Sequence, residues 1–167
     1  MRFLVTYGSK RGGTQGLAHQ VAESLRTEGF AVDVLPVGDV HELTGYDVVI
    51  VGGALYAGRW HKAARAFVLR HTAELRRCPT YFFSSGPLDA SAVQRDIPPV
   101  RGVAELMRRV GACGHATFGG RLSPYARGFT ASAMAKKHAG DWRDPGQVRD
   151  WTRQIAASLR HDLRVSA

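Results

Sequence analysis

Apolar residues along this chain occur in two patterns, short continuous runs and stripes with helical spacing. The runs predict strands, and they cover residues 2–7, 31–35, 47–51, 79–83 and, more weakly, 116–122. The stripes predict amphipathic helices over residues 14–28, 62–76, 101–110 and 147–159. The third run, Asp47-Val48-Val49-Ile50-Val51, is typical of a strand covered on both faces. Gly52-Gly53 then predict the start of a loop, and the prolines within residues 84–100 predict an irregular segment.

The alternation of predicted strands and helices determines the expected architecture. Strands connected through helices form a parallel sheet with right-handed crossovers and helices on both faces. The length of 167 residues suits one domain covering residues 1–167. Ligands of such α/β sheets bind beyond the carboxyl ends of the strands. The chemistry of the chain is therefore expected in the loops that follow residues 7, 51 and 83.

Charge is distributed unevenly along the chain. The net charge is +9, and residues 101–167 contribute 12 basic and 5 acidic side chains, against 11 and 9 in residues 1–100. A basic surface attracts anionic small molecules, acidic proteins, nucleic acid or anionic membranes. The alternative is that scattered arginines only form a solvated surface. Nucleic acid is not expected, because no basic stripe alternates with aromatic residues in a known module. Contact with a membrane is expected to be peripheral at most.

Cysteine, histidine and hydropathy patterns exclude several further classes. No apolar run approaches the length of about 20 residues that a spanning helix needs, and the amino terminus lacks the order of a signal peptide. We therefore expect a cytoplasmic protein. Cys78 and Cys113 form no paired motif and are predicted to be buried packing groups. The seven histidines lack metal-ligand spacing, so no metal site is predicted.

The loop between the first strand and the first helix carries hydroxyls, cations and glycines. Its residues are Ser9, Lys10, Arg11, Gly12, Gly13 and Thr14. A helix start offers unpaired N–H groups and partial positive charge, and glycine lets the backbone approach an anion. The loop therefore favours a phosphate site. The alternative is an ordinary turn, which uses the same residue types for capping.

Two further loops are expected beside this one at the same edge of the sheet. Small residues, Tyr56 and Trp60 lie between Gly52 and His61, and Ser84-Ser85-Gly86-Pro87-Leu88 follows the fourth strand. Small residues let the backbone lie along a ring plane and hydrogen-bond its heteroatoms. Together the three loops predict a pocket for a phosphorylated, flat aromatic molecule.

Three segments resemble the flavodoxin-like FMN-binding family, and most closely its branch of menaquinone-dependent protoporphyrinogen dehydrogenases. Ser9, Gly12 and Thr14 match the family's phosphate-loop pattern. Residues 52–61, leading into Phe67-Val68, resemble the branch's second flavin loop, and Gly140-Asp141-Trp142-Arg143-Asp144 resembles the lead into its last helix. The segment 123–139 is shorter and richer in alanine than the branch's insertion.

The resemblance implies a fold and a cofactor. The fold is a flavodoxin-like α/β three-layer sandwich with a five-stranded parallel sheet of order 2-1-3-4-5, and the cofactor is FMN. Residues 9–14 would hold the phosphate, with Tyr56 or Trp60 near the isoalloxazine ring. The segments flanking that ring would be Ala54, Leu55, Tyr56, Ala57 and Gly58, and Ser84, Ser85, Gly86 and Leu88. No side chain is nominated as an acid, base or nucleophile, because the flavin carries the redox chemistry.

Two functions remain open at this point. The first is an FMN-dependent oxidoreductase acting on a quinone, a porphyrinogen or another conjugated substrate, preferably an anionic one. The second is a flavodoxin-type electron-transfer protein, for which a charge of +9 requires acidic partners. A phosphoacceptor receiver domain is disfavoured, since Thr6-Tyr7-Gly8 stands where its acidic residues are needed.

Overall fold

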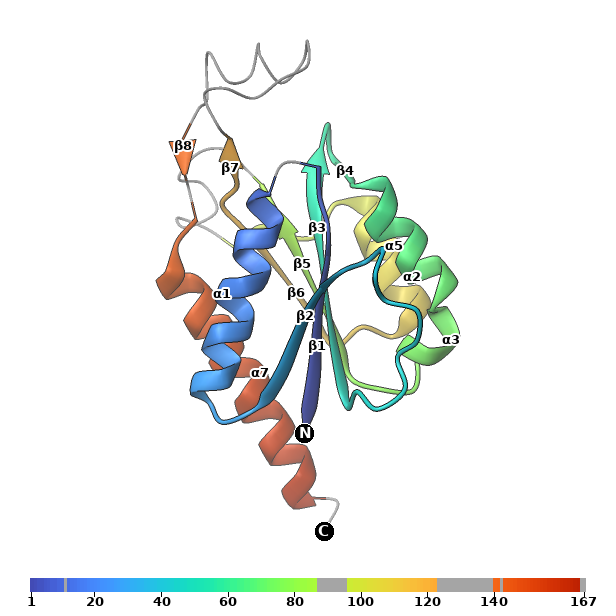
Figure 1. The fold of residues 1–167 in the computed structure, drawn as a ribbon, viewed down its shortest axis with the longest axis vertical. Helices are drawn as coiled ribbons and strands as arrows, with labels where there is room; N and C mark the ends of the chain where they lie inside the picture. The colour runs from blue at the N-terminus through green and yellow to red at the C-terminus, as the bar shows by residue number, and fades with distance from the viewer. Residues whose placement is uncertain (11, 87–95, 123–139, 142, 166–167) are drawn as a thin grey trace.

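The main sheet has the predicted strand order. The computed structural model describes residues 1–10, 12–86, 96–122, 140–141 and 143–165. Parallel strands follow the order β2-β1-β3-β5-β6, and a short β4 pairs antiparallel with β3 (Figure 1). These strands are β1 (Arg2–Gly8), β2 (Ala31–Pro36), β3 (Val48–Tyr56), β4 (Arg59–Trp60), β5 (Thr80–Ser85) and β6 (Gly114–Phe118). Because β5 and β6 are the fourth and fifth predicted runs, the expected order 2-1-3-4-5 is confirmed.

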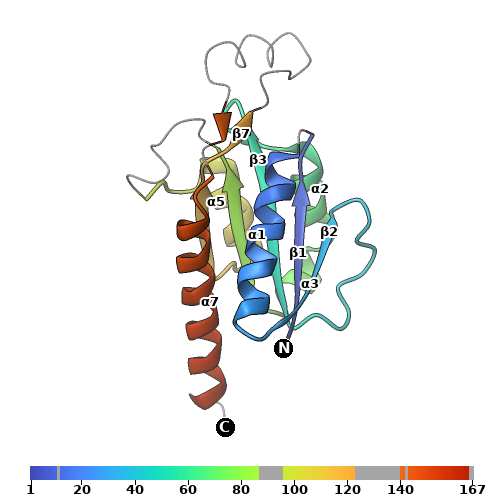
Figure 2. The same ribbon diagram turned by 60° about the vertical axis from the view of Figure 1, so that its left-hand side comes forward.

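Helices cover both faces of the sheet and complete three layers. They are α1 (Gly13–Thr27), α2 (Lys62–Arg70), α3 (Thr72–Leu75), α5 (Arg101–Val110) and α7 (Pro145–Val165). Figures 1 and 2 show α1 and α7 on one face and α2, α3 and α5 on the other. The carboxyl-terminal helix α7 extends past the end of the sheet (Figure 2).

Side-chain alternation along the strands divides the core between the two faces. On β1, Phe3 and Val5 join the apolar cluster under α1 and α7, whereas Leu4 joins the cluster under α2 and α5. Phe83 and Phe82 divide in the same way on β5. All five side chains are fully buried, so the central strands are apolar on both faces, as expected of a covered parallel sheet.

The prediction that β3 ends at Gly52-Gly53 is wrong. The strand continues to Tyr56 and turns back into β4. Both glycines make room for aromatic rings, because a Cβ atom at Gly52 would overlap the ring of Phe83 and one at Gly53 would lie 2.5 Å from the indole of Trp60. At these two positions glycine allows aromatic rings to pack closely on the strand, and it does not end the strand.

Two other predicted elements are divided in the structure. The helix predicted over residues 62–76 breaks at His71, which ends α2 and precedes α3. The buried His71 ring packs on Phe67 and its Nδ1 lies 3.1 Å from Glu74 Oε2, so His71 belongs to the core and not to its boundary. The fifth predicted strand ends at Phe118, and β7 (Arg121–Leu122) pairs antiparallel with β8 (Gly140–Asp141) in a separate sheet.

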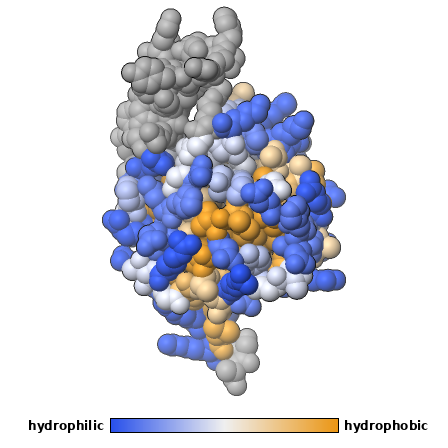
Figure 3. Space-filling model, in the orientation of Figure 1, coloured by the Kyte–Doolittle hydropathy of each residue, from blue (hydrophilic) through white to orange (hydrophobic). Residues whose placement is uncertain are grey.

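The surface and the cysteines add two findings. Figure 3 shows that hydrophilic side chains cover most of the face seen in Figure 1, with an apolar area over the edge strand β2. Cys78 is half-buried, and burial raises the pKa of its thiol. Cys113 is exposed, so the prediction that it is a buried packing group is wrong. Among the described residues, no helix combines the length and apolar character needed to cross a membrane.

Candidate functional site

The strand register brings the three predicted loop segments together at one edge of the sheet. Gly8 on β1 is aligned with Gly53 on β3, and Gly53 is aligned with Ser84 on β5. The next pair, Ala54 and Ser85, continues the same edge. The ends of β1, β3 and β5 therefore form one continuous platform, as the sequence predicts.

The turn between β1 and α1 leaves the start of the helix open. Gly12 has a left-handed conformation with φ 75°, and no side chain caps the helix. A Cβ atom at Gly12 would meet nothing within 4 Å, and the carbonyl oxygen of Gly12 already accepts the N–H of Gly16 at 3.0 Å. An uncapped helix start with open space before it is the geometry that binds anions in proteins.

Thr14 supplies the second observation at this turn. Its side chain is 1% exposed, and its hydroxyl has no hydrogen-bond partner among the described residues. A buried hydroxyl without a partner is unfavourable by about 1 to 3 kcal/mol. Thr6 on β1 has the same deficit, but Thr14 alone of these two lies in the first turn of an uncapped helix. The placement of Thr14 fits a group whose partner is a bound anion.

The other members of this loop have different positions. Lys10 is exposed, Ser9 is half-buried, and Gly13 is buried where α1 begins. Arg11 lies outside the described residues. Burial is the main cause that lowers the pKa of His61, and the positive charge of Lys10 adds to it. The charge of Lys10 therefore acts on His61, the N-cap residue of α2.

Residues 54–58 form a hairpin and not an open loop. Ala54, Leu55 and Tyr56 lie in β3, and the pair Tyr56–Arg59 closes a two-residue turn made by Ala57 and Gly58. Both turn residues have positive φ, 47° and 71°. This is the pattern of a type I′ turn, in which glycine is favoured and alanine is unusual. The hairpin extends beyond the sheet edge beside the start of α2 (Figure 1).

His61 ties the hairpin to the helix that follows. Its backbone N–H donates to the carbonyl of Ala54 at 2.8 Å, and its Nδ1 accepts the N–H of Ala63 at 3.4 Å. Its ring lies 5.9 Å from that of Tyr56. Tyr56 therefore contacts the ring that also caps α2, and its predicted place near the isoalloxazine ring stays a prediction.

Trp60, the other aromatic residue predicted near the isoalloxazine ring, is buried in the core. The indole is 3% exposed and packs on Phe82, with ring centroids 5.0 Å apart, and over Gly53. Its Nε1 donates to Ser84 Oγ at 2.8 Å. Trp60 is therefore a core residue on the α2 side of the sheet, because the missing side chain at Gly53 gives its ring room there.

Ser84 is committed to the same buried network. Its Oγ lies 2.9 Å from Nε2 of His115. Ser84 Oγ accepts the indole N–H of Trp60, and toward His115 it can donate or accept, according to which ring nitrogen of His115 carries the proton. Burial lowers the pKa of His115 to about 4, although the carboxylate of Asp96 acts to raise it. The Ser84 hydroxyl thus faces Trp60 and His115 in this arrangement.

The remaining residues of the third segment lie at the end of β5. Ser85 is buried and Gly86 has φ 147°, with its N–H donating to the carbonyl of Phe118 at 2.9 Å. A Cβ atom at Gly86 would touch Leu55 at 3.4 Å, so the second and third segments are in contact. Leu88 lies outside the described residues.

Comparison with known proteins agrees with this geometry. A family model for the flavodoxin domain matches residues 4–137. The chain belongs to the flavodoxin domain family. Over 86 residues the domain is 30% identical to protoporphyrinogen IX dehydrogenase [quinone] of Escherichia coli strain K12, covering 50% of this chain and 48% of that protein. The predicted resemblance is thus confirmed, and the chain spans about half the length of the curated relatives it matches.

Solved structures of the same fold resemble this flavodoxin domain at low sequence identity. Oxidised flavodoxin 2 from Bacillus cereus is 19% identical with a TM-score of 0.59, covering 95% of this chain and 99% of that one. Rubredoxin oxygen:oxidoreductase from Desulfovibrio gigas is 16% identical with a TM-score of 0.67, covering 97% and 37%. These likenesses confirm the predicted flavodoxin-like α/β fold.

The structure adds Arg143 to the site. Its guanidinium occupies the space that a Cβ atom at Gly16 would need, in the first turns of α1. In the sequence, Arg143 stands out only as part of the segment 140–144 that resembles the family. A glycine inside an amphipathic helix is a signal for close packing, and Gly16 was the available clue. Arg143 brings a permanent positive charge to the helix start that already carries the Thr14 hydroxyl.

The electrostatics of this flavodoxin domain suit an anion at α1. Thr14, the uncapped helix start and Arg143 all offer donors or positive charge there. Within the described ranges, no group of three or more histidine, cysteine, aspartate or glutamate side chains is placed to hold a metal ion. The residues present therefore fit a phosphate-bearing cofactor at the carboxyl edge.

Proposed function

We propose that this flavodoxin domain binds FMN at the platform formed by the ends of β1, β3 and β5. The observation that carries the proposal is the buried, unpartnered hydroxyl of Thr14 in the uncapped first turn of α1. Family membership supports the choice of cofactor. The phosphate would be held by Thr14, the backbone of Gly12 and Gly13 and the charge of Arg143.

The flavin ring would lie against the hairpin and the end of β5. Ala54 and Ala57 present only methyl groups there, and Gly58 and Gly86 present none. Small side chains let backbone groups approach a ring plane. Tyr56, fixed by the His61 ring, is the aromatic side chain that borders this space.

When bound, FMN supplies hydride or electron transfer. The chain's own residues contribute binding and orientation. Thr14 and Arg143 hold the phosphate end, and the Ala57-Gly58 turn sets where the ring edge lies. The buried network of Trp60, Ser84 and His115 stiffens the platform from the opposite side of the sheet.

The reaction we propose is oxidation or reduction of a quinone, a porphyrinogen or another conjugated substrate. The identity with a protoporphyrinogen IX dehydrogenase [quinone], over half of this chain, supports it. The net charge of +9 favours an anionic substrate.

The second candidate is an electron-transfer protein with acidic partners. It is favoured by the likeness to a complete flavodoxin chain, of which this domain covers 99%. Turnover separates the two candidates. Reduced holoprotein that is reoxidised by menadione over many cycles supports the enzyme, whereas one-electron exchange with an acidic carrier protein and no quinone turnover supports the carrier.

Binding calorimetry with FMN and riboflavin tests the cofactor site, because the two ligands differ only by the phosphate. Wild-type protein is expected to bind FMN more tightly than riboflavin. Thr14→Val should weaken FMN binding about tenfold or more, since a hydrogen bond to a charged group is worth about 1.5 to 3 kcal/mol. Riboflavin binding should not change.

Thr6→Val is the matched control. Thr6 is equally buried and its hydroxyl also lacks a partner among the described residues, but it lies within β1 and outside the three segments. The control should bind both flavins as wild type does. Equal FMN affinity in Thr14→Val and wild type, or equal affinity of wild type for the two flavins, would contradict the phosphate assignment.

A further inference from the structure

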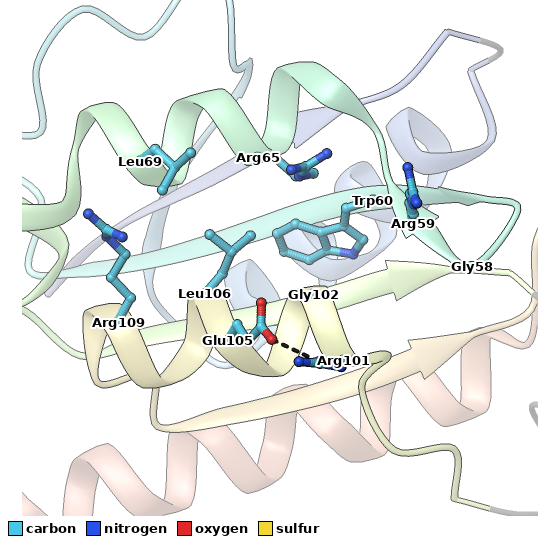
Figure 4. A pocket seen from close by; sticks show the side chains of 10 residues that line it. All are labelled: Gly58, Arg59, Trp60, Arg65, Leu69, Arg101, Gly102, Glu105, Leu106 and Arg109. Atoms are coloured by element: carbon cyan, nitrogen blue, oxygen red, sulfur yellow. Dashed lines mark hydrogen bonds and ion pairs between the residues drawn. The ribbon is translucent and has the colours of Figure 1, made fainter.

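A groove lies between α2 and α5, on the face of the sheet opposite α1. Its volume is about 640 Å³, a size typical of sites for small organic molecules. Figure 4 shows side chains of the two helices lining it, with the hairpin residues Gly58 and Arg59 at one end. The groove is therefore adjacent to the hairpin, but its remaining walls belong to helices.

Four arginines line this groove, and they come from three elements. Arg59 lies on β4, Arg65 on α2, and Arg101 and Arg109 on α5. In Figure 4, Arg59 and Arg109 lie at opposite ends of the groove. Arg101 pairs with Glu105 at 3.0 Å, whereas the other three arginines form no ion pair with any residue that the structure describes. Glu105 offsets only one of the four positive charges, so the groove has a net positive charge that attracts anions.

The floor of the groove is apolar. Trp60 and Leu106 are nearly buried, at 3% and 8% exposure, and their edges line the cavity. Leu69, 47% exposed, adds an apolar wall beside Arg109 (Figure 4). Leu69 thus extends the apolar lining that Trp60 and Leu106 provide.

Glycine keeps two walls of the groove open. A Cβ atom at Gly102 on α5 or at Gly58 in the hairpin turn would meet nothing within 4 Å. Gly102 has no positive φ, so a side chain can be accepted there without backbone strain. A large residue at position 102 would therefore project into free space at the groove.

From this arrangement we infer that the groove binds an amphipathic organic anion, an aromatic acid carrying carboxylate, sulfonate or phosphate groups. The anionic groups would pair with Arg59, Arg65 or Arg109, and the aromatic body would cover Trp60, Leu69 and Leu106. The inference does not require FMN binding, because Arg65, Leu69 and Arg109 lie on α2 and α5, outside the three segments proposed for FMN.

Titration with 1-anilinonaphthalene-8-sulfonate, an aromatic sulfonate, tests the groove by calorimetry, with and without saturating FMN. Wild-type protein should bind one equivalent in both conditions. The double variant Arg65→Gln/Arg109→Gln should bind at least tenfold more weakly, and Gly102→Phe should lose binding while keeping all four arginines. N-phenyl-1-naphthylamine, which lacks the sulfonate, should bind much more weakly to wild type and be insensitive to the arginine substitutions.

The matched control is Arg149→Gln/Arg164→Gln, which removes two exposed arginines from α7 on the other face. It should bind the sulfonate as wild type does, and circular dichroism should show every variant folded. Equal binding in the groove variants and wild type would overturn the inference. So would an equal loss in the α7 control, displacement of the probe by FMN, or an acidic peptide that binds the groove more tightly than the aromatic sulfonate.

Discussion

The carboxyl edge of the sheet and the α2–α5 groove are both suited to anions, but they use different parts of the chain. At the edge, the donors are an uncapped helix start and the short side chain of Thr14. In the groove, the charge comes from long arginines above an apolar floor. Backbone donors are fixed once the turn has formed, whereas arginine side chains lose rotamer freedom on binding. The edge is therefore expected to be the more selective site and the groove the more adaptable one.

Trp60 is the residue that links the two regions. One side of its indole covers Gly53 and reaches Ser84, and the ring also lines the groove. The indole of Trp60 is therefore closely packed against Gly53 at the edge of the sheet and borders the cavity of the groove. The predictions below probe that contrast.

The largest expected effect is the difference in stability between a side chain added at Gly53, at the edge, and one added at Gly102, in the groove. Gly53→Val would place a side chain within the indole of Trp60 and should lower the free energy of unfolding by about 3 kcal/mol or more, because the strand cannot move away from the packed ring. Gly102→Ala adds a methyl group in open space on a helix. It should raise the free energy of unfolding by about 0.5 to 1 kcal/mol.

Urea denaturation of the apoprotein measures both changes. The comparison would fail if Gly53→Val unfolded at the same urea concentration as wild type, or if Gly102→Ala were the more destabilised of the two.

The second effect is a pH dependence that originates at His115. Its pKa is about 4 in the folded protein, below its ordinary value of 6.5, because burial disfavours the charged ring. Between these pH values the unfolded chain binds a proton that the folded protein does not. Stability from this group is therefore complete above pH 6.5 and is lost as the pH falls through 4, by about 3 kcal/mol.

His115→Gln should remove this dependence of stability on pH. The measurement is the difference in unfolding free energy between variant and wild type from about pH 4 to 7.5. His41→Gln, which removes an exposed histidine, is the control. A difference between His115→Gln and wild type that stays constant with pH would exclude His115 as the source.

The smallest effect concerns Thr14 in the absence of ligand. Thr14→Val replaces an unpartnered buried hydroxyl by a methyl group of similar shape, and should stabilise the apoprotein by up to about 1 kcal/mol. The same substitution weakens FMN binding in our proposal. A thermal melt of Thr14→Val that is clearly less stable than wild type would show that the hydroxyl has a structural partner.

Sequence patterns predicted the sheet well where side chains alternate or cluster locally. The run Val48-Val49-Ile50-Val51 and the stripe of Val103, Leu106 and Val110 both correspond to observed elements. The start of α5 and its end agree with the predicted residues 101–110, because apolar spacing and the following Gly111 are local signals.

The errors occurred where a residue's role depends on a distant neighbour. Gly52 and Gly53 are typical of the end of a strand, but in the structure they make room for the rings of Phe83 and Trp60. The sequence likewise gives no sign that the indole N–H of Trp60 donates to Ser84, 24 positions later in the chain. Local propensity contains no information on such contacts.

The same distinction between local and distant neighbours applies to the residues of the candidate site. The loop proposed to hold a phosphate could be predicted because glycines, hydroxyls and cations stand together at a strand-to-helix junction. Arg143 and the arginine groove could not, since their partners are far apart in the sequence.

What the sequence alone determined was the succession of strands and helices along the chain, which arises from short-range periodicity, and the family, which arises from the resemblance of three segments. The phosphate role of residues 9–14 stays a prediction from turn chemistry. Only the tertiary structure decided that Thr14 lacks a partner among the described residues, that Ser84 is committed to Trp60 and His115, and that four arginines border one groove. The physical reason is that burial, hydrogen-bond satisfaction and charge clustering depend on distances between segments, which exist only once the sheet has aligned its strands.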